Sequence, residues 1–286
     1  MNHINPIYYF YIGASLFYIV DVLQKITSAH VNTYEYLMRR SVYTCIVSLI
    51  GTVLFSGMAS APSIEVVFQI VGCSLLTYGG IYFYIKAIHS LNFSNANSIF
   101  IVGNVLQQLI GIFLFNEKFQ IWMVLSWLLM SFGCLYQMAF TKWSRGALYV
   151  LLSSLFWTVG YSLLSLVLKN GYEMWSVAIM ESTTLGISIL IFVLFKRNKK
   201  ITPAVNQPHH SFLYLSIIAI SLFGASYYNH ISFRYNPISL ISLMQLSMMP
   251  LSFLLNRRLF KETPSKIEWI SLFTGIVGFV IFIIFS

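Results

Sequence analysis

Glu181 is a single carboxylate inside the apolar stretch 177–190. A charged side chain at the centre of a membrane costs roughly 2.5 to 3.5 kcal/mol on insertion scales, so it usually faces a cavity or a partner. By depth along the chain, Tyr227 and His230 lie within hydrogen-bond reach, whereas Arg40 starts near the opposite face and is not expected to pair with it. Glu181 and His230 are therefore candidate coupling or proton sites. The alternative is a protonated Glu181 that ties two helices together.

Amide side chains share one face of an apolar segment at 94–115, where Asn104, Gln107 and Gln108 recur at helical spacing. Carboxamides both donate and accept hydrogen bonds, so this stripe could bind a polar solute. Hydrogen bonding between helices is the alternative. Gln245 belongs to a similar stripe in a later segment. These four amides are predicted substrate-binding residues.

Aromatic side chains could form the walls of a cavity for an organic solute, although aromatic residues near helix ends also form belts at the membrane interface. The predicted substrate-binding aromatics are Tyr82, Trp157, Tyr161 and Tyr227. Asp21 and Lys25 are four residues apart and can pair along one helix face. Arg40 lies near a helix end, from which its side chain can reach the interface. We interpret these three charged residues as a gate or as structural groups.

The patterns that enzymes, metal sites and nucleotide-driven pumps need are missing from the sequence. It contains no His-Glu-x-x-His and no Gly-Lys-Ser/Thr. Cys45, Cys73 and Cys134 show no metal-ligand spacing. We therefore expect no enzyme, no catalytic residues, no metal and no cofactor.

The composition points to lipid as the main solvent of this chain. Of its 286 residues, 58% are hydrophobic and only 9% are charged, against about a quarter in soluble domains, and the mean hydropathy is +0.77. The net charge of +9 lies in short clusters between apolar segments. Such clusters are typical of topology signals, so no nucleic-acid partner is expected.

The apolar segments are long enough to cross a membrane as helices, which takes about 20 residues each. They do not alternate between apolar and polar residues as barrel strands do. The sequence therefore predicts an all-α membrane protein with ten transmembrane helices. The predicted spans are 6–25, 36–57, 64–88, 94–115, 120–140, 145–168, 173–195, 211–233, 237–255 and 266–285.

The two halves of the chain resemble each other. Ser15-Leu16-Phe17 matches Ser154-Leu155-Phe156, and one offset relates both Phe115-Asn116-Glu117 to Phe260-Lys261-Glu262 and Gly133 to Gly278. These matches indicate a duplicated five-helix unit, 1–143 and 144–286, in one integrated transmembrane domain. Because five is odd, the second copy must enter the membrane from the opposite side, which gives two inverted five-helix repeats.

Together, these features resemble the drug/metabolite transporter superfamily, EamA type. The residues that carry the resemblance are Glu117 with Gly133, Glu262 with Gly278, and the Ser-Leu-Phe pieces that open each copy. The resemblance implies a carrier of metabolites or drugs. It also implies a central cavity lined by helices one to four and six to nine, with helices five and ten supporting from outside. Val105 stands where the second copy has Pro250, so a proline bend is expected only in the ninth helix.

Lysine and arginine predict how the chain faces. With both termini outside, most of these residues lie on the cytoplasmic side, and only Lys118, Lys169 and Arg234 lie outside. The resemblance implies the reverse, with cytoplasmic termini. We expect an integral protein of a bacterial inner (plasma) membrane, as a monomer or homodimer.

The predicted function is secondary active transport of a small polar or amphipathic organic metabolite by alternating access, with a possible proton coupling or exchange. Membrane lipid and a small-molecule substrate are the expected partners. The alternatives are a non-transporting receptor or channel-like protein and an enzyme that acts on lipid.

Overall fold

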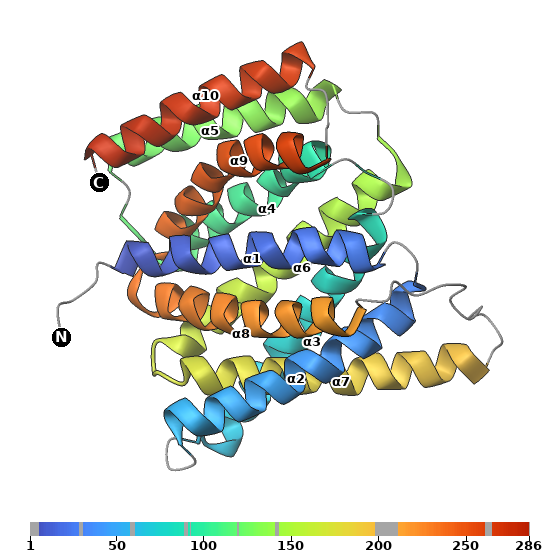
Figure 1. Cartoon of the computed structure of the whole chain (residues 1–286). Helices are drawn as coiled ribbons and strands as arrows, with labels where there is room; N and C mark the ends of the chain where they lie inside the picture. Colours follow the sequence, from blue (N-terminus) through green and yellow to red (C-terminus); the bar gives the residue numbers. More distant parts are fainter. Residues whose placement is uncertain are drawn as a thin grey trace. The chain divides into compact units, whose positions relative to one another are not determined.

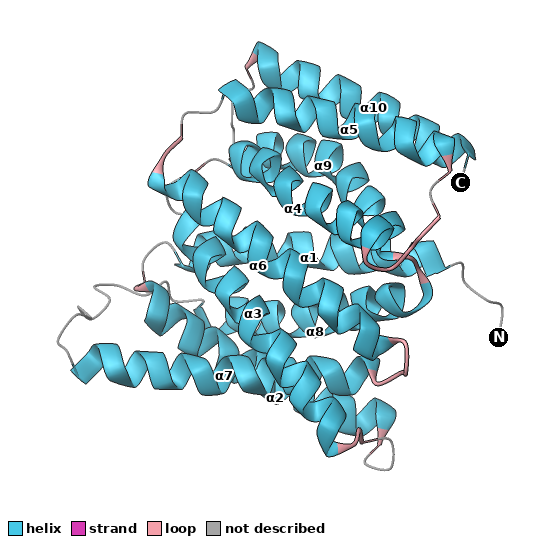
Figure 2. Ribbon diagram, turned by 180° about the vertical axis from the view of Figure 1, so that it is seen from behind, coloured by secondary structure: helices cyan, strands magenta, loops and turns pink. Residues whose placement is uncertain are grey.

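The computed structural model confirms an all-helical protein. In the part of the chain that it describes there are ten α-helices and no strand (Figure 2). The described residues are 6–28, 31–57, 61–88, 91, 93–118, 120–140, 143–197, 211–260 and 265–285. The helices are α1 (Pro6–Ser28), α2 (Thr33–Ser56), α3 (Ile64–Ile88), α4 (Phe93–Phe113), α5 (Ile121–Phe140), α6 (Arg145–Leu168), α7 (Glu173–Arg197), α8 (Ser211–Tyr235), α9 (Ile238–Phe260) and α10 (Lys266–Phe285).

The predicted spans agree with these helices, and the differences lie at helix ends. Capping explains the start of α2, since the Asn32 side chain accepts a hydrogen bond from Tyr34 N at 3.0 Å. The helix therefore begins at Thr33 and not at 36. Its first turn carries Glu35, which pairs with Arg39 one turn later; hydropathy alone placed this acid outside the span. The C-terminal end of α9 also differs from the prediction. This helix continues beyond residue 255, through Arg257 and Arg258, to Phe260.

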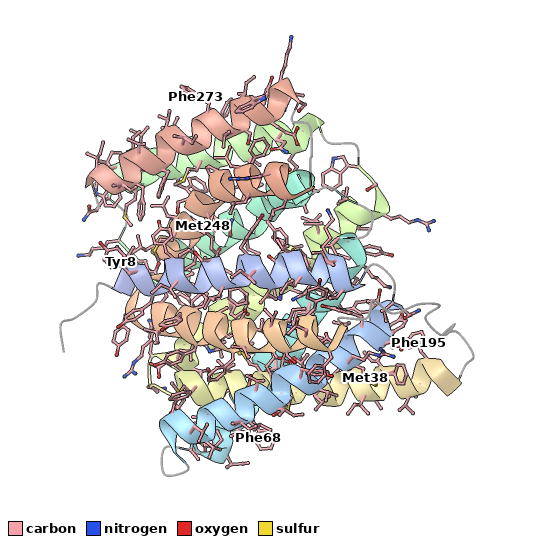
Figure 3. All side chains as sticks on the ribbon, in the orientation of Figure 1. Tyr8, Met38, Phe68, Phe195, Met248 and Phe273 are labelled. Atoms are coloured by element: carbon pink, nitrogen blue, oxygen red, sulfur yellow. The ribbon has the colours of Figure 1, made fainter. Side chains whose placement is uncertain are left out.

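Large apolar side chains cover the outsides of these helices. Phe68 is 68% exposed and Phe273 is 69% exposed, and in Figure 3 both project away from their helices. Helices satisfy their own backbone hydrogen bonds, which is what a hydrocarbon solvent requires. Among the described helices, nine are long and apolar enough to span a membrane, and α4 contributes a shorter apolar stretch, Ser98–Phe113.

The helices form two compact units, and each unit draws on both predicted repeats. Unit 1 contains Met1–Ile85 with Leu163–Tyr235, and unit 2 contains Lys86–Ser162 with Asn236–Ser286. Within unit 1, α1 packs on α8, and α2 packs on α7 and α8. Within unit 2, α4 packs on α9 and α5 lies beside α10 (Figure 1). Each of these contacts therefore joins a helix of the first copy to a helix of the second.

Two glycines allow α5 and α10 to approach closely. A Cβ at Gly133 would lie 2.7 Å from the carbonyl oxygen of Ser271, and a Cβ at Gly278 would lie 2.6 Å from Met130 Cγ. Small residues let helix backbones pack together where lipid removes the usual hydrophobic driving force. Gly133 and Gly278 are thus required for the packing of these two helices.

Glu117 caps the start of α9. Its Oε1 accepts a hydrogen bond from Ile238 N at 2.7 Å, and its Oε2 accepts one from Ser239 N at 2.8 Å. These are N–H groups that no helical carbonyl can reach, and a carboxylate also complements the positive end of the helix dipole. Glu117 is therefore a structural residue. Its counterpart Glu262 lies outside the described residues.

Glu117→Gln is expected to destabilise the protein by about 1 to 2 kcal/mol. The amide oxygen can accept one of the two backbone hydrogen bonds, but the amide NH₂ group then faces the other backbone N–H and cannot accept from it. A lower melting temperature of the detergent-solubilised protein would report the loss. Glu65→Gln is the matched control, since Glu65 is an exposed acid in the first turn of α3. Equal shifts for the two variants would contradict the cap.

Candidate functional site

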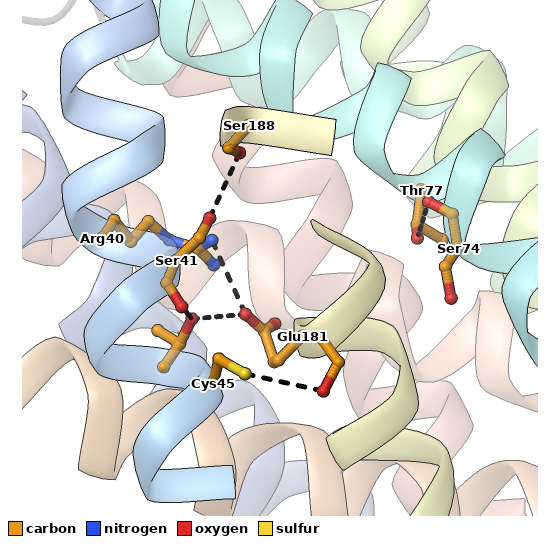
Figure 4. A network of polar contacts seen from close by, with 9 residues as sticks. Arg40, Ser41, Cys45, Ser74, Thr77, Glu181 and Ser188 are labelled. Atoms are coloured by element: carbon orange, nitrogen blue, oxygen red, sulfur yellow. Dashed lines mark hydrogen bonds and ion pairs between the residues drawn. The ribbon is translucent and has the colours of Figure 1, made fainter. Parts of the chain in front are cut away.

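Glu181 is buried in unit 1 and faces α2 (Figure 4). Thr44 Oγ1 donates a hydrogen bond to Glu181 Oε2 at 2.5 Å, and Nη1 of Arg40 lies 4.0 Å from the same oxygen. Glu181 is 7% exposed and Arg40 is 2% exposed. Two expectations are therefore wrong: Arg40 does pair with Glu181, and the partners of Glu181 are not Tyr227 and His230.

The antiparallel packing of α2 and α7 explains this pair. Ser41 Oγ lies 3.4 Å from Ser188 Oγ, and Thr52 Oγ1 donates to the carbonyl oxygen of Met174 at 2.9 Å. Arg40 is therefore roughly level with Ser188, about two turns or on the order of 10 Å along α7 from Glu181. The long side chains of Arg40 and Glu181 span that separation. The prediction placed each residue by its depth along its own helix and did not include the length of these side chains.

A second carboxylate belongs to the electrostatic environment of Arg40. Asp21 of α1 interacts electrostatically with Arg40 and hydrogen-bonds the Tyr84 hydroxyl of α3. Asp21, Arg40 and Glu181 thus form a charge cluster from three helices, in which the cation and one acid are buried and the second acid, Asp21, is half-buried. The predicted pairing of Asp21 with Lys25 stays a prediction.

The guanidinium is not fully paired by the protein. Nε and Nη1 of Arg40 have no hydrogen-bond partner, although both are buried. A buried donor without a partner usually costs about 1 to 3 kcal/mol, and more when it is charged. The contact with Glu181, at 4.0 Å, is a long ion pair. Arg40 Nη1 and Glu181 are therefore close enough to attract each other but too far apart to form a hydrogen bond.

His230 belongs to α8 and lies elsewhere in unit 1, where its side chain contacts the first turn of α7. Its Nδ1 is 2.7 Å from Ser176 Oγ and 3.3 Å from the carbonyl oxygen of Glu173. One turn further along α8, Arg234 Nη1 donates to Glu173 Oε1 at 2.6 Å. His230 and Arg234 therefore fix α8 to the first turn of α7, and the structure does not bring His230 to Glu181.

The predicted aromatic residues are divided between the units. In unit 1 the Tyr82 hydroxyl is 3.0 Å from the Tyr34 hydroxyl, and Tyr227 packs against Tyr228 with centroids 5.5 Å apart. In unit 2 Trp157 stacks on Phe100 at 5.7 Å. Tyr161 is half-buried in α6 of that unit.

The predicted amides all lie in unit 2. Asn104, Gln107 and Gln108 are buried in α4, and Gln245 is half-buried in α9. Ser242 Oγ donates to the Asn104 carbonyl at 2.7 Å, so the stripes of α4 and α9 belong to packed helices. Nε2 of Gln107 and both amide atoms of Gln108 have no hydrogen-bond partner. The side chain of Gln108 is therefore not an interhelical tie.

Sequence reasoning missed three polar residues of unit 1. Thr44 was within reach of a pattern argument, since it lies four residues after Arg40 on the same helix face. Tyr84 and Ser176 gave no such signal, because a hydroxyl in an apolar segment looks the same whether it bonds its own backbone or another helix.

The described helices define a multi-pass integral membrane protein. The EamA-like transporter family matches this chain twice, over residues 5–138 and 144–284. The chain therefore belongs to the EamA-like transporter family of the drug/metabolite transporter superfamily, and it is a membrane transporter. A family of transporters also implies a lipid environment and a small-molecule substrate.

Solved structures share this fold. One, described as "Crystal structure of protein", is 17% identical, covers 97% of this chain and 97% of its own, and has a TM-score of 0.72. At that identity the likeness shows the fold alone. No curated protein matches the chain.

Replacing Arg40 by Met is expected to destabilise the protein by about 3 to 5 kcal/mol, because it leaves the buried Glu181 and the half-buried Asp21 without their cation. The double variant Arg40→Met/Glu181→Met restores the wild-type net charge of the cluster and is expected to be more stable than Arg40→Met. Melting temperatures in detergent measure both.

Arg39→Met is the matched control, since Arg39 is one residue away but partly exposed in the ion pair with Glu35. Exposed pairs contribute about 1 kcal/mol or less. Similar losses for Arg39→Met and Arg40→Met would contradict a buried charge cluster.

Proposed function

We propose that this transporter is a secondary active carrier that moves a small polar or amphipathic organic metabolite by alternating access. The observation that carries the proposal is the buried pair of Arg40 and Glu181, with the half-buried Asp21 beside it, within membrane-spanning helices. Charges inside a membrane are costly and usually mark a transport pathway or a proton site. The sequence has no nucleotide-binding loop, so a gradient or the exchange of two solutes supplies the energy.

The charge balance of the cluster supports proton coupling at Glu181. One guanidinium faces two carboxylates, so a further positive charge is needed for neutrality. A proton provides it without requiring space in a packed site. A proton on Glu181 weakens its attraction to Arg40 and thereby the contact between α2 and α7, so the two protonation states favour different arrangements of these helices.

The unpartnered amides support a polar substrate. Gln107 and Gln108 together present buried donors and an acceptor, which a solute with both kinds of group would satisfy. We assign substrate binding to Asn104, Gln107, Gln108 and Gln245. The aromatic walls would come from Tyr82, Trp157, Tyr161 and Tyr227.

The remaining charged residues have supporting roles in this proposal. Asp21, Lys25 and Arg40 form a gate in unit 1, where Asp21 and Arg40 already interact. His230 contributes to coupling through its contact with the first turn of α7. It acts on the helix that carries Glu181 and not on the carboxylate itself.

Glu181→Gln is expected to preserve the fold and to abolish accumulation driven by a pH gradient, because the amide cannot exchange a proton. The test substrate is the amino acid, nucleoside or amine that most raises the melting temperature of the wild type. Uptake into proteoliposomes is then measured with and without the gradient.

Glu35→Gln is the control, since it removes an acid from the ion pair at the start of α2. Driven uptake by Glu181→Gln with an unchanged pH dependence would contradict the proton site and leave Glu181 as a tie between helices. Ohmic current, or a chemical product, would contradict a carrier altogether.

We also propose a bacterial inner membrane with both termini outside, on the distribution of lysine and arginine. A cysteine at Asn170, between α6 and α7, is then expected to react with an impermeant maleimide in intact cells. A cysteine at Ser144, between α5 and α6, should react only after lysis. The native cysteines are all buried and give a low background. The opposite labelling pattern would reverse the orientation.

A further inference from the structure

We propose that unit 1 holds a second ligand site, a cavity that binds small organic cations with an amine and an apolar or aromatic group. The cavity lies where α2 ends and α7 begins, and its volume is about 420 Å³. Small-molecule pockets commonly measure about 300 to 1,000 Å³. The cavity shares Tyr227 with the aromatic residues assigned above to substrate binding. None of its lining residues belongs to the charge cluster, so the site does not depend on the proposed role of Glu181.

The chemistry of the lining points to a cation. Four aromatic residues and one acid contribute to it: Phe55, Tyr172, Trp175, Tyr227 and Glu173. Aromatic faces attract ammonium groups through their quadrupoles. Glu173 is the charged residue of this lining, and its negative charge offsets the positive dipole end of α7. The last residues of α2 also line the cavity, which adds the negative dipole end of that helix.

Glu173 can contact a ligand without losing its present partner. The hydrogen bond from Arg234 uses Oε1 at 2.6 Å, and the side chain of Glu173 remains 15% exposed. Within the described residues, no contact is recorded for Oε2. An ammonium group in the cavity therefore has a carboxylate oxygen to bind.

The backbone before α7 has an unusual conformation that places another aromatic residue at the cavity. Tyr172 has a φ of 72° and follows Gly171, whose φ is 97°. A bulky side chain rarely adopts the left-handed region, and such strain concentrates at functional sites. Glycine at 172 would remove the strain, but it would also remove an aromatic wall.

Ligand binding would compete with an interhelical contact. The pair Glu173–Arg234 joins α7 to α8, and an ammonium group that approaches Glu173 shares the negative charge that holds Arg234. Arg234 has a second contact, the ring of Tyr235 at 5.1 Å. A bound cation is therefore expected to weaken the α7–α8 contact, and loss of Arg234 is expected to strengthen cation binding.

Isothermal titration calorimetry of the detergent-solubilised full chain with 2-phenylethylamine tests the site. We expect saturable binding of this amine and at least tenfold weaker binding of phenylacetate and 2-phenylethanol, which keep the ring and change the charge. Glu173→Gln should weaken amine binding at least tenfold. Arg234→Gln should tighten it about threefold or more, a change in the opposite direction that general damage to the fold would not produce.

Variants at three further positions distinguish this cavity from the charge cluster and from general damage to the fold. Trp175→Leu should weaken amine binding and Trp175→Phe should retain most of it, which keeps the test valid if Glu173→Gln fails to fold. Glu35→Gln, which disrupts an ion pair elsewhere on α2, should leave binding unchanged. Glu181→Gln should also leave amine binding unchanged. The proposed amine site would therefore stand even if Glu181 is not a proton site.

Equal binding of phenylacetate, or unchanged binding in Glu173→Gln and Trp175→Leu, would overturn the proposal. Weaker binding in Arg234→Gln would overturn the competition between the ligand and Arg234. Loss of amine binding by Glu181→Gln would move the site to the charge cluster.

Discussion

A buried guanidinium must find its anions inside the protein. Arg40 meets this requirement with a carboxylate from α7 and another from α1, and Tyr84 of α3 holds the second of these. Four helices of unit 1 are therefore arranged around one positive charge. Arg39 shows the contrast, because it is partly exposed at the helix end and needs only the acid one turn before it. Two neighbouring residues of α2 therefore have different environments: Arg39 is in a partly exposed ion pair, and Arg40 is in the interior of unit 1.

Duplication explains why the helices pair as they do. The contacts α2–α7, α4–α9 and α5–α10 each join a helix to its counterpart in the other copy. A duplicated surface that packs against itself needs only one set of complementary residues, as Gly133 and Gly278 show at the α5–α10 contact. Polar chemistry has diverged, since Arg40 belongs to the first copy and Glu181 to the second. The fold therefore remains symmetric where it packs and has become asymmetric where it carries charge.

The sequence predicted the helices well because lipid leaves few alternatives to a helix of about 20 apolar residues. It could not predict the partners of Glu181, because hydropathy locates a residue along its own helix but not the reach of a side chain from the next one. The two units could not be predicted either, since the two family matches, 5–138 and 144–284, are consecutive in sequence, whereas each unit contains helices from both. The amides of α4 were found by their spacing, but their lack of partners is a property of packing alone.

The cap on α9 has a consequence for how the chain is made. Glu117 bonds residues 121 and 122 positions later, and Ser41 contacts Ser188 at a separation of 147. The first five helices therefore leave the ribosome with their acceptor groups unfilled and their packing faces open to lipid. They must wait in the membrane until the second copy is inserted. Contacts so distant in sequence are slow to form, so the half-made protein is the state that most needs protection by the insertion machinery.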